Sequence, residues 1–239
     1  MKFQTVIFDC DSTLSAVEGI EELARDHRAE VEQLTEEAMR GAVPLEQVYG
    51  RRLELVRPPK GRVLALGRHY IENIVPDTRE TIAALRSEGI AVRIMSGGLK
   101  PAVLILAAEL GIEESAVDAV DVYFGADGKY AGFDEASPLA VSFGKRRVVE
   151  SWGETVAQPM MFVGDGQTDL EAQPVVDAFV AFAGVIFRPK VVSATNLVIR
   201  EKSLAPVVPL ALGGEPPHSA EAQAVFERGR SLLTTNSRI

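Results

Sequence analysis

Short apolar runs that alternate with helix-like stretches constrain the fold of this chain more than any other feature. The runs are nearly unbroken, as strands buried on both faces of a sheet are. They are Thr5–Phe8, Val92–Met95, Ala119–Phe124, Met160–Val163 and Ala178–Ala183. The helix-like stretches between the later runs are Thr78–Glu88, Lys100–Leu110 and Lys145–Trp152. This alternation predicts an α/β fold, with a doubly wound, mainly parallel sheet covered by helices on both faces.

The first run departs from the alternation, because helical patterns and no strand follow it from Glu18 to Asn73. These helices are amphipathic and are interrupted at Gly41–Pro44 and at Pro58-Pro59. We expect residues 15–76 to form a helical cap, inserted into a core made of residues 1–14 and 77–212. A cap at this point can exclude water from a site and select the substrate.

The remaining segments carry local signals of their own. Asp127-Gly128, within Gly125–Phe133, predicts a short hairpin. Gly213–Pro217 interrupts the chain, and Ser219–Leu233 then has the pattern of one amphipathic helix. Residues 213–239 are therefore expected to form a helical tail whose last residues fray.

Composition narrows the possible partners. The formal net charge of −9 argues against nucleic acid, although a small anionic substrate responds to local charges instead. The single cysteine, Cys10, excludes an internal disulfide and a multi-cysteine zinc site. The first apolar run is too short for a signal peptide, and no run is long enough for a membrane span. We expect a cytoplasmic protein without a membrane partner.

Two acids, Asp9 and Asp11, follow the first apolar run and precede Ser12-Thr13. An acidic turn would explain them, since Asp is common in turns. Folding does not require two carboxyl groups at the end of a buried strand, however. A site that combines a nucleophile, an acid–base group and a metal ligand does require them.

Three further features follow predicted strands, where open α/β sheets bind ligands. Ser96-Gly97-Gly98 offers a hydroxyl and glycine amides that can hold a phosphoryl oxygen, although a plain glycine turn is the alternative. Gly164–Asp169 carries two acids that could bind a divalent cation or form a turn and a helix cap. Lys145 opens a helix after Gly144, either as a surface charge or as the cation that the carboxylates need.

In this combination and order, the four features resemble the haloacid dehalogenase superfamily of aspartyl-phosphate phosphotransferases. Within it, the chain is most similar to the phosphoserine phosphatase family, over roughly residues 3–200 and not over the tail. The segments that carry this similarity are Phe8–Leu14, Glu18–Ala24, Ala38–Gly41, Arg51–Leu53, Ala131–Glu135, Gly144-Lys145, Gly164–Ala172 and Asp177–Arg188.

The resemblance implies a Mg²⁺-dependent phosphatase that hydrolyses O-phospho-L-serine through an aspartyl phosphate. Asp9 would be the nucleophile and Asp11 the general acid and base. Mg²⁺ would be bound by Asp9, the main-chain carbonyl of Asp11, and Asp165. Asp169 would orient Lys145 or a water on the metal. Ser96 and Lys145 would hold the phosphoryl oxygens and so complete the catalytic set.

The resemblance also implies a substrate pocket. Glu18 would bind the amine of the substrate, and Arg52 its carboxylate, which the planar guanidinium matches. Without the resemblance, both would be read as ordinary helix-surface charges. The full implied set is Glu18, Met39, Arg52, Ser96, Gly97, Gly98, Lys145 and Thr168. Leu45, Leu99 and Gln167 depart from the family pattern at positions expected beside this pocket.

Three alternatives stay open from the sequence. The nearest is a phosphatase of the same fold that acts on another small phosphomonoester. A phospho-accepting signalling module also places an Asp at a strand end near other acids and a Lys. The length, the helical cap and Asp11 argue against it. A transport-ATPase phosphorylation domain would require a membrane segment.

Overall fold

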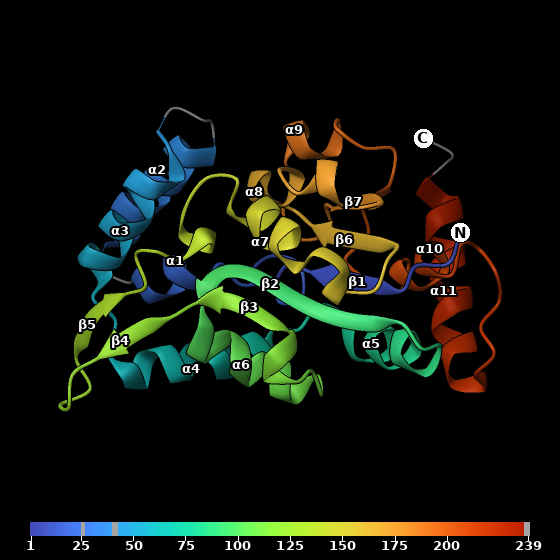
Figure 1. The fold of residues 1–239 in the computed structure, drawn as a ribbon, viewed down its shortest axis with the longest axis horizontal. Coiled ribbons are helices and arrows are strands. Elements are labelled where there is room, and N and C mark those ends of the chain that lie inside the picture. The colour runs from blue at the N-terminus through green and yellow to red at the C-terminus, as the bar shows by residue number, and fades with distance from the viewer. Residues whose placement is uncertain (25–26, 40–42, 237–239) are drawn as a thin grey trace.

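A six-stranded parallel sheet forms the centre of the computed structural model, which describes residues 1–24, 27–39 and 43–236 (Figure 1). The strand order is β3-β2-β1-β6-β7-β8. β1 pairs in parallel with both β2 and β6, so the first strand lies at the middle of the sheet. The strands are β1 (Thr5–Phe8), β2 (Ala91–Leu99), β3 (Val117–Val120), β6 (Met160–Gly164), β7 (Ala178–Phe182) and β8 (Val198–Ile199).

Helices cover both faces of this sheet, which confirms the predicted doubly wound α/β fold (Figure 1). One face carries α4 (Lys60–Glu72), α5 (Thr78–Ser87) and α6 (Lys100–Glu109), and the other carries α7 (Gly144–Trp152), α8 (Gln167–Leu170) and α9 (Pro189–Val192). Every residue of β1 and of β6 is buried, which explains why their sequences are continuous apolar runs. Among the described residues, no helix is both long and apolar enough to cross a membrane.

Three helices stand together at the carboxyl end of the sheet, where the cap is predicted (Figure 1). They are α1 (Gly19–Ala24), α2 (Arg28–Met39) and α3 (Leu45–Val56). The predicted interruption at Pro58-Pro59 separates α3 from α4, whereas part of the Gly41–Pro44 interruption lies outside the described residues. α4 packs along α6, where a Cβ at Gly67 would come within 2.7 Å of Ile105. The division at residue 76 stays a prediction.

One predicted strand is wrong. Ala119–Phe124 is divided between β3, in the main sheet, and β4 (Val122–Phe124), which pairs with β5 (Tyr130–Phe133) in a separate antiparallel pair. The chain leaves the parallel sheet at Asp121, whose carbonyl accepts a hydrogen bond of 2.9 Å from the Asp134 amide at the base of the hairpin. The predicted hairpin itself is confirmed.

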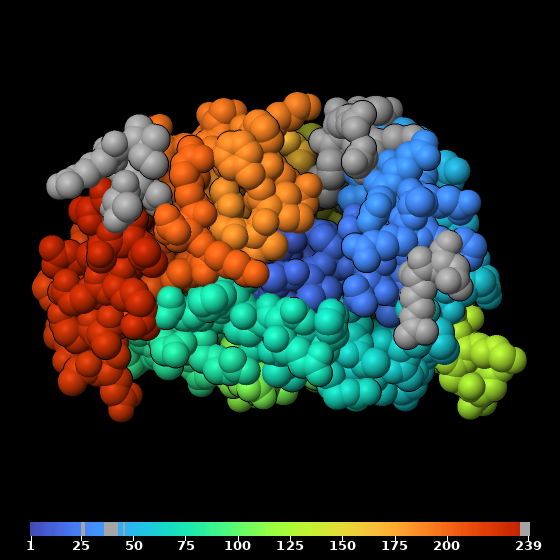
Figure 2. All heavy atoms as spheres, turned by 180° about the vertical axis from the view of Figure 1, so that it is seen from behind, coloured from blue at the N-terminus to red at the C-terminus, as the bar shows by residue number. Residues whose placement is uncertain are grey.

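The tail forms α11 (Ala220–Asn236), which packs against α5 and α10 (Val207–Ala211) at the end of the molecule opposite α1 and α2 (Figure 2). The predicted helix at Ser219–Leu233 is therefore confirmed, while residues 237–239, expected to fray, lie outside the described residues. The buried Glu88 carboxylate accepts hydrogen bonds from the amides of His218 (2.7 Å) and Ser219 (3.0 Å). Burial alone would raise the pKa of Glu88, but the hydrogen bonds from the His218 side chain and these amides lower it to about 2.

Candidate active site

The functional residues predicted from the sequence gather in one cavity of about 90 Å³ at the carboxyl ends of β1, β2 and β6. The cavity is lined by the core and by residues of the cap helices. Asp169 is fully buried and does not line it, and the side chain of Met39 lies outside the described residues. The predicted residues that line it are Asp9, Asp11, Glu18, Arg52, Ser96, Gly97, Gly98, Lys145, Asp165 and Thr168.

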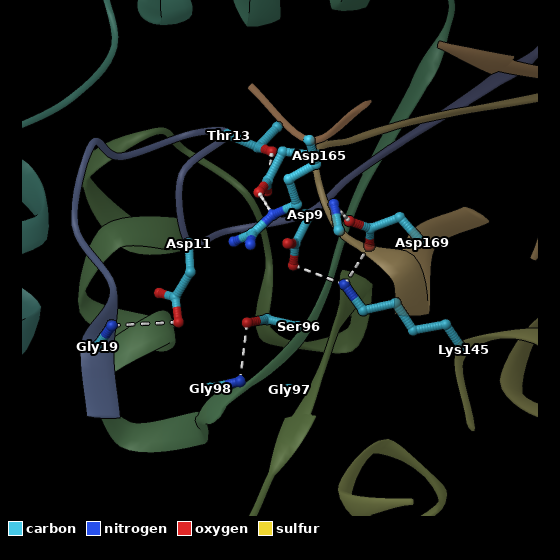
Figure 3. A network of polar contacts seen from close by, with 12 residues as sticks. Asp9, Asp11, Thr13, Gly19, Ser96, Gly97, Gly98, Lys145, Asp165 and Asp169 are labelled. Atoms are coloured by element: carbon cyan, nitrogen blue, oxygen red, sulfur yellow. Dashed lines mark hydrogen bonds and ion pairs between the residues drawn. The ribbon is translucent and has the colours of Figure 1, made fainter. Parts of the chain in front are cut away.

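Lys145 is the buried cation of the site. Its Nζ lies 2.7 Å from Asp9 Oδ1 and also contacts Asp169 Oδ1 (Figure 3). The preceding residue, Gly144, lets the chain pass close to Pro138 at this point. A Cβ at Gly144 would lie 1.6 Å from the Pro138 carbonyl oxygen, so a larger residue would displace the start of α7 and Lys145 with it. Burial would lower the pKa of Lys145, but the charges of Asp169 and Asp9 raise it above its ordinary value. The ammonium therefore stays charged beside the predicted nucleophile.

Asp165 and Asp169 leave the end of β6 on a tight loop. A Cβ at Gly164 would lie 2.4 Å from the Asp169 side chain, so this approach requires glycine. The Gly166 amide donates a hydrogen bond of 2.8 Å to Asp169 Oδ2. Asp165 receives hydrogen bonds from Arg188 Nε, at 2.9 Å, and from the Thr13 hydroxyl, at 3.3 Å. Both carboxylates are thus held in place by hydrogen bonds.

The charges around these acids suit a divalent cation. Asp9, Asp165 and Asp169 are buried, and each can offer an oxygen within 4.8 Å of the others. Burial, followed by the charge of Asp169, raises the pKa of Asp9 well above its ordinary range and that of Asp165 to about 7. Each of these carboxylates also accepts hydrogen bonds: Asp169 from Lys145 and the Gly166 amide, Asp165 from Arg188 and Thr13, and Asp9 from Lys145. This oxygen donor set fits a hard cation.

Asp11 points away from this cluster, toward the start of α1 (Figure 3). Its Oδ1 accepts a hydrogen bond of 2.6 Å from the Tyr70 hydroxyl, and its Oδ2 accepts one of 3.2 Å from the Gly19 amide. Burial, followed by the charge of Glu18, raises the pKa of Asp11 to about 8, against the lowering effect of Tyr70. A raised pKa favours the protonated form of Asp11 that a general acid requires.

The Ser96-Gly97-Gly98 segment is the last part of β2, rather than a turn after a strand that ends at Met95. The Gly98 amide donates a hydrogen bond of 2.9 Å to Ser96 Oγ, so the Ser96 hydroxyl proton is available to an anion (Figure 3). The Tyr49 hydroxyl donates a hydrogen bond of 2.8 Å to the Gly97 carbonyl. Tyr49 lies on α3, so this bond links the predicted cap directly to the segment predicted to bind phosphate.

Glu18 and Arg52 also line the cavity. Glu18 Oε1 accepts hydrogen bonds from Ser12 Oγ (2.6 Å) and Arg188 Nη2 (3.3 Å). Arg52 is only 9% exposed, and its Nη1 donates a hydrogen bond of 3.1 Å to Thr35 Oγ1. Its Nε has no hydrogen-bond partner among the described residues. Burying a guanidinium with an unpaired N–H donor costs free energy, unless a ligand accepts a hydrogen bond from that donor.

Sequence reasoning missed several residues of the cavity. Arg188 ends one of the segments that resemble the family, but the resemblance assigned it no role. In the structure it bridges Asp165 and Glu18. Two departures from the family pattern, Leu99 and Gln167, do not line the cavity, and the side chain of Leu45 lies outside the described residues. The lining residues that the sequence did not indicate are Ile20, Glu21, Thr35, Tyr49, Leu139, Val141, Gly166 and Arg188.

Comparisons with known proteins agree with this geometry. Residues 3–173 match the model of the haloacid dehalogenase-like hydrolases. Phosphoserine phosphatase of Bos taurus is 38% identical over 189 residues, which are 78% of this chain and 84% of the bovine protein. A phosphoserine phosphohydrolase-like protein of Francisella tularensis superposes with a TM-score of 0.76 at 25% identity, over 84% of this chain and 96% of that one.

A substrate-bound phosphoserine phosphatase complex superposes with a TM-score of 0.74 at 26% identity, over 88% of this chain and 99% of that one. The match to a hydrolase family also favours catalysis over a phospho-accepting signalling module. The family match and the bovine relative each extend over most of the chain, and the chain belongs to the haloacid dehalogenase-like hydrolases.

Proposed function

We propose that this protein is a Mg²⁺-dependent phosphoric monoester hydrolase that converts O-phospho-L-serine to serine and phosphate. The observation that carries the proposal is Arg52, a buried guanidinium with an unused Nε, in the same cavity as Glu18 and Asp9. Arg52 suits the carboxylate of an amino acid, and Glu18 suits its ammonium group. The names of the relatives support the same substrate.

The first chemical step transfers the phosphoryl group to Asp9. A carboxylate oxygen of Asp9 attacks phosphorus as the bond from phosphorus to the serine oxygen breaks. The proton of Asp11 moves to that oxygen, and serine leaves as the neutral alcohol. Ser96 and Lys145 stabilise the oxygens of the transferring group, because their donors are already in place.

The second step hydrolyses the aspartyl phosphate. Asp11, now a carboxylate, takes a proton from a water molecule as the oxygen of that water attacks phosphorus. The bond between Asp9 and phosphorus breaks, and inorganic phosphate leaves. Asp11 ends the cycle protonated, in agreement with its raised pKa of about 8.

Mg²⁺ fits the donors at the bottom of the cavity. Asp9, Asp165 and the main-chain carbonyl of Asp11 would hold it, with Asp169 orienting Lys145. When bound, it supplies positive charge that reduces the repulsion between the Asp9 carboxylate and the phosphate.

The test is a comparison of kcat/KM among substrates that lack one recognition group at a time. O-phosphoserine carries both groups, phosphoethanolamine lacks the carboxylate, and p-nitrophenyl phosphate lacks both. We expect phosphoserine to be the best substrate, and the Asp9→Asn variant to be inactive on all three. Equal values of kcat/KM for phosphoserine and phosphoethanolamine would refute the assigned role of Arg52 and leave a phosphatase for another small phosphomonoester.

A further inference from the structure

Tyr70 makes the shortest hydrogen bond to the Asp11 carboxyl group. It lies on α4, is fully buried, and donates from Oη to Asp11 Oδ1 at 2.6 Å. The Gly19 amide donates a longer bond, of 3.2 Å, to Oδ2 of this carboxyl group. Neither the sequence motifs nor the resemblance to the family pointed to Tyr70.

The surroundings of Tyr70 fix its hydroxyl in this place. The start of α1 packs directly against the hydroxyl, because a Cβ at Gly19 would lie 2.1 Å from Tyr70 Oη. The Ser15 hydroxyl donates a hydrogen bond of 3.0 Å to the Tyr70 carbonyl. The absence of a side chain at Gly67, one turn earlier on α4, lets this helix lie directly on α6. The tyrosine ring therefore enters the site from a helix that is itself tightly packed.

We propose that Tyr70 is a positioning residue for the acid–base group Asp11. Its bond to Oδ1, the shorter of the two that the carboxyl group accepts, fixes the rotation of that group. Oδ2, which also accepts the longer bond from the Gly19 amide, is the oxygen that exchanges a proton with the leaving group. The terminal torsion of an aspartate is otherwise broad, so a single strong donor on one oxygen decides which oxygen faces the reaction. This inference rests on the proposed acid–base role of Asp11 and is independent of which alcohol is released.

The role predicts a dependence on the leaving group that a merely structural tyrosine would not produce. A poor leaving group needs the proton of Asp11 as its bond to phosphorus breaks, whereas p-nitrophenolate leaves without one. Misplacement of Asp11 therefore slows the release of poor leaving groups selectively.

The experiment measures kcat/KM of wild type and Tyr70→Phe for phenyl, p-chlorophenyl and p-nitrophenyl phosphate, in the presence of Mg²⁺. The substitution keeps the ring and removes only the hydroxyl. We expect a fall of ~10- to 100-fold for phenyl phosphate, because part of the ~10²–10⁴-fold that positioned acid catalysis contributes would be lost. For p-nitrophenyl phosphate we expect a change below ~3-fold, because its leaving group needs little acid catalysis.

Tyr130→Phe is the matched control. The Tyr130 hydroxyl is also buried, but it has no hydrogen-bond partner among the described residues and lies on the hairpin strand β5. Its removal should leave kcat/KM unchanged for all three esters. Should Tyr70→Phe not fold, Ser15→Ala loosens the end of α4 without removing a ring and must give the same selective pattern.

A double-mutant cycle completes the test. If Tyr70 acts through Asp11, Tyr70→Phe has little further effect on phenyl phosphate once Asp11→Asn is present. Equal losses on all three esters, or full additivity with Asp11→Asn, would overturn the inference. Because all three esters lack an amino-acid group, a wild type that fails to prefer phosphoserine refutes the proposed substrate and leaves this result intact.

Discussion

Replacing Arg52 with alanine should separate substrate recognition from phosphoryl chemistry. Arg52 donates to Thr35, lies 5.6 Å from the centre of the Tyr49 ring, and keeps its Nε unused. The hydrogen bonds that join Lys145 to Asp9 and Asp169 do not involve Arg52. Arg52→Ala therefore removes a donor for the substrate while leaving the groups that act on phosphorus in place.

The size of the effect follows from the contact that is lost. One hydrogen bond to a charged group contributes ~1.5–3 kcal/mol, which corresponds to a ~10- to 150-fold fall in kcat/KM for O-phosphoserine. p-Nitrophenyl phosphate has no carboxylate, so its kcat/KM should change by less than ~3-fold. Arg52→Lys should restore only part of the loss, because an ammonium lacks the planar fork of the guanidinium.

The assay measures phosphate release from both esters, with Arg51→Ala as the matched control. Arg51 is the preceding residue of α3 and is exposed, so its removal tests for a general loss of positive charge. We expect Arg51→Ala to behave as wild type on both esters. Equal losses on both esters in Arg52→Ala would show that Arg52 supports the cap through Tyr49 instead, and the assigned recognition would be refuted.

The other predictions concern the chemistry and the stability of the fold. Asp9→Asn should abolish turnover, and EDTA should do so reversibly, with activity returning on addition of Mg²⁺; residual turnover in Asp9→Asn would contradict a covalent step. Asp11→Asn should lower kcat by ~10²–10⁴-fold with little change in binding, as steady-state and binding measurements together can check. The folded-state pKa of Glu88 is lowered from 4.5 to about 2, so its stabilising effect is complete above pH 4.5 and is lost as the pH falls toward 2. Thermal unfolding of wild type against Glu88→Gln over that range should show the difference in melting temperature shrinking with acidity, and a constant difference would count against the linkage.

The parts of the site at strand ends could be predicted because each produces a local pattern in the sequence. A buried parallel strand is a continuous apolar run, and the residue after it must lie at the carboxyl edge of the sheet. Asp9 and Asp165 come together for that reason, and Ser96, in the last part of β2, lines the same cavity. Glu18 and Arg52 have no such signal, since charged residues on helices are usually solvated, and only the resemblance pointed to them.

The missed residues depend on contacts between distant parts of the chain. Tyr70 reaches Asp11 from α4, which packs against α6, and the pattern of neither helix predicts that packing. Arg188 meets Glu18 across 170 residues of sequence. The prediction of a single strand at Ala119–Phe124 failed for a related reason. The apolar pattern continues there, while the chain passes from one sheet to another. β8 is two residues long, too short to produce a periodic signal.

The position of the chain's beginning has a practical consequence for attaching this enzyme to a surface. The Phe3 amide donates a hydrogen bond of 2.8 Å to the Ala211 carbonyl, and Met1 is 72% exposed beside the terminal helices. The cavity lies at the other end of β1, where Asp9 is one of its lining residues. A support linked through the amino terminus would therefore hold the molecule at the end away from the cavity. Phosphate esters could then diffuse in from the bulk solution, and α1 and α2 would stay away from the matrix.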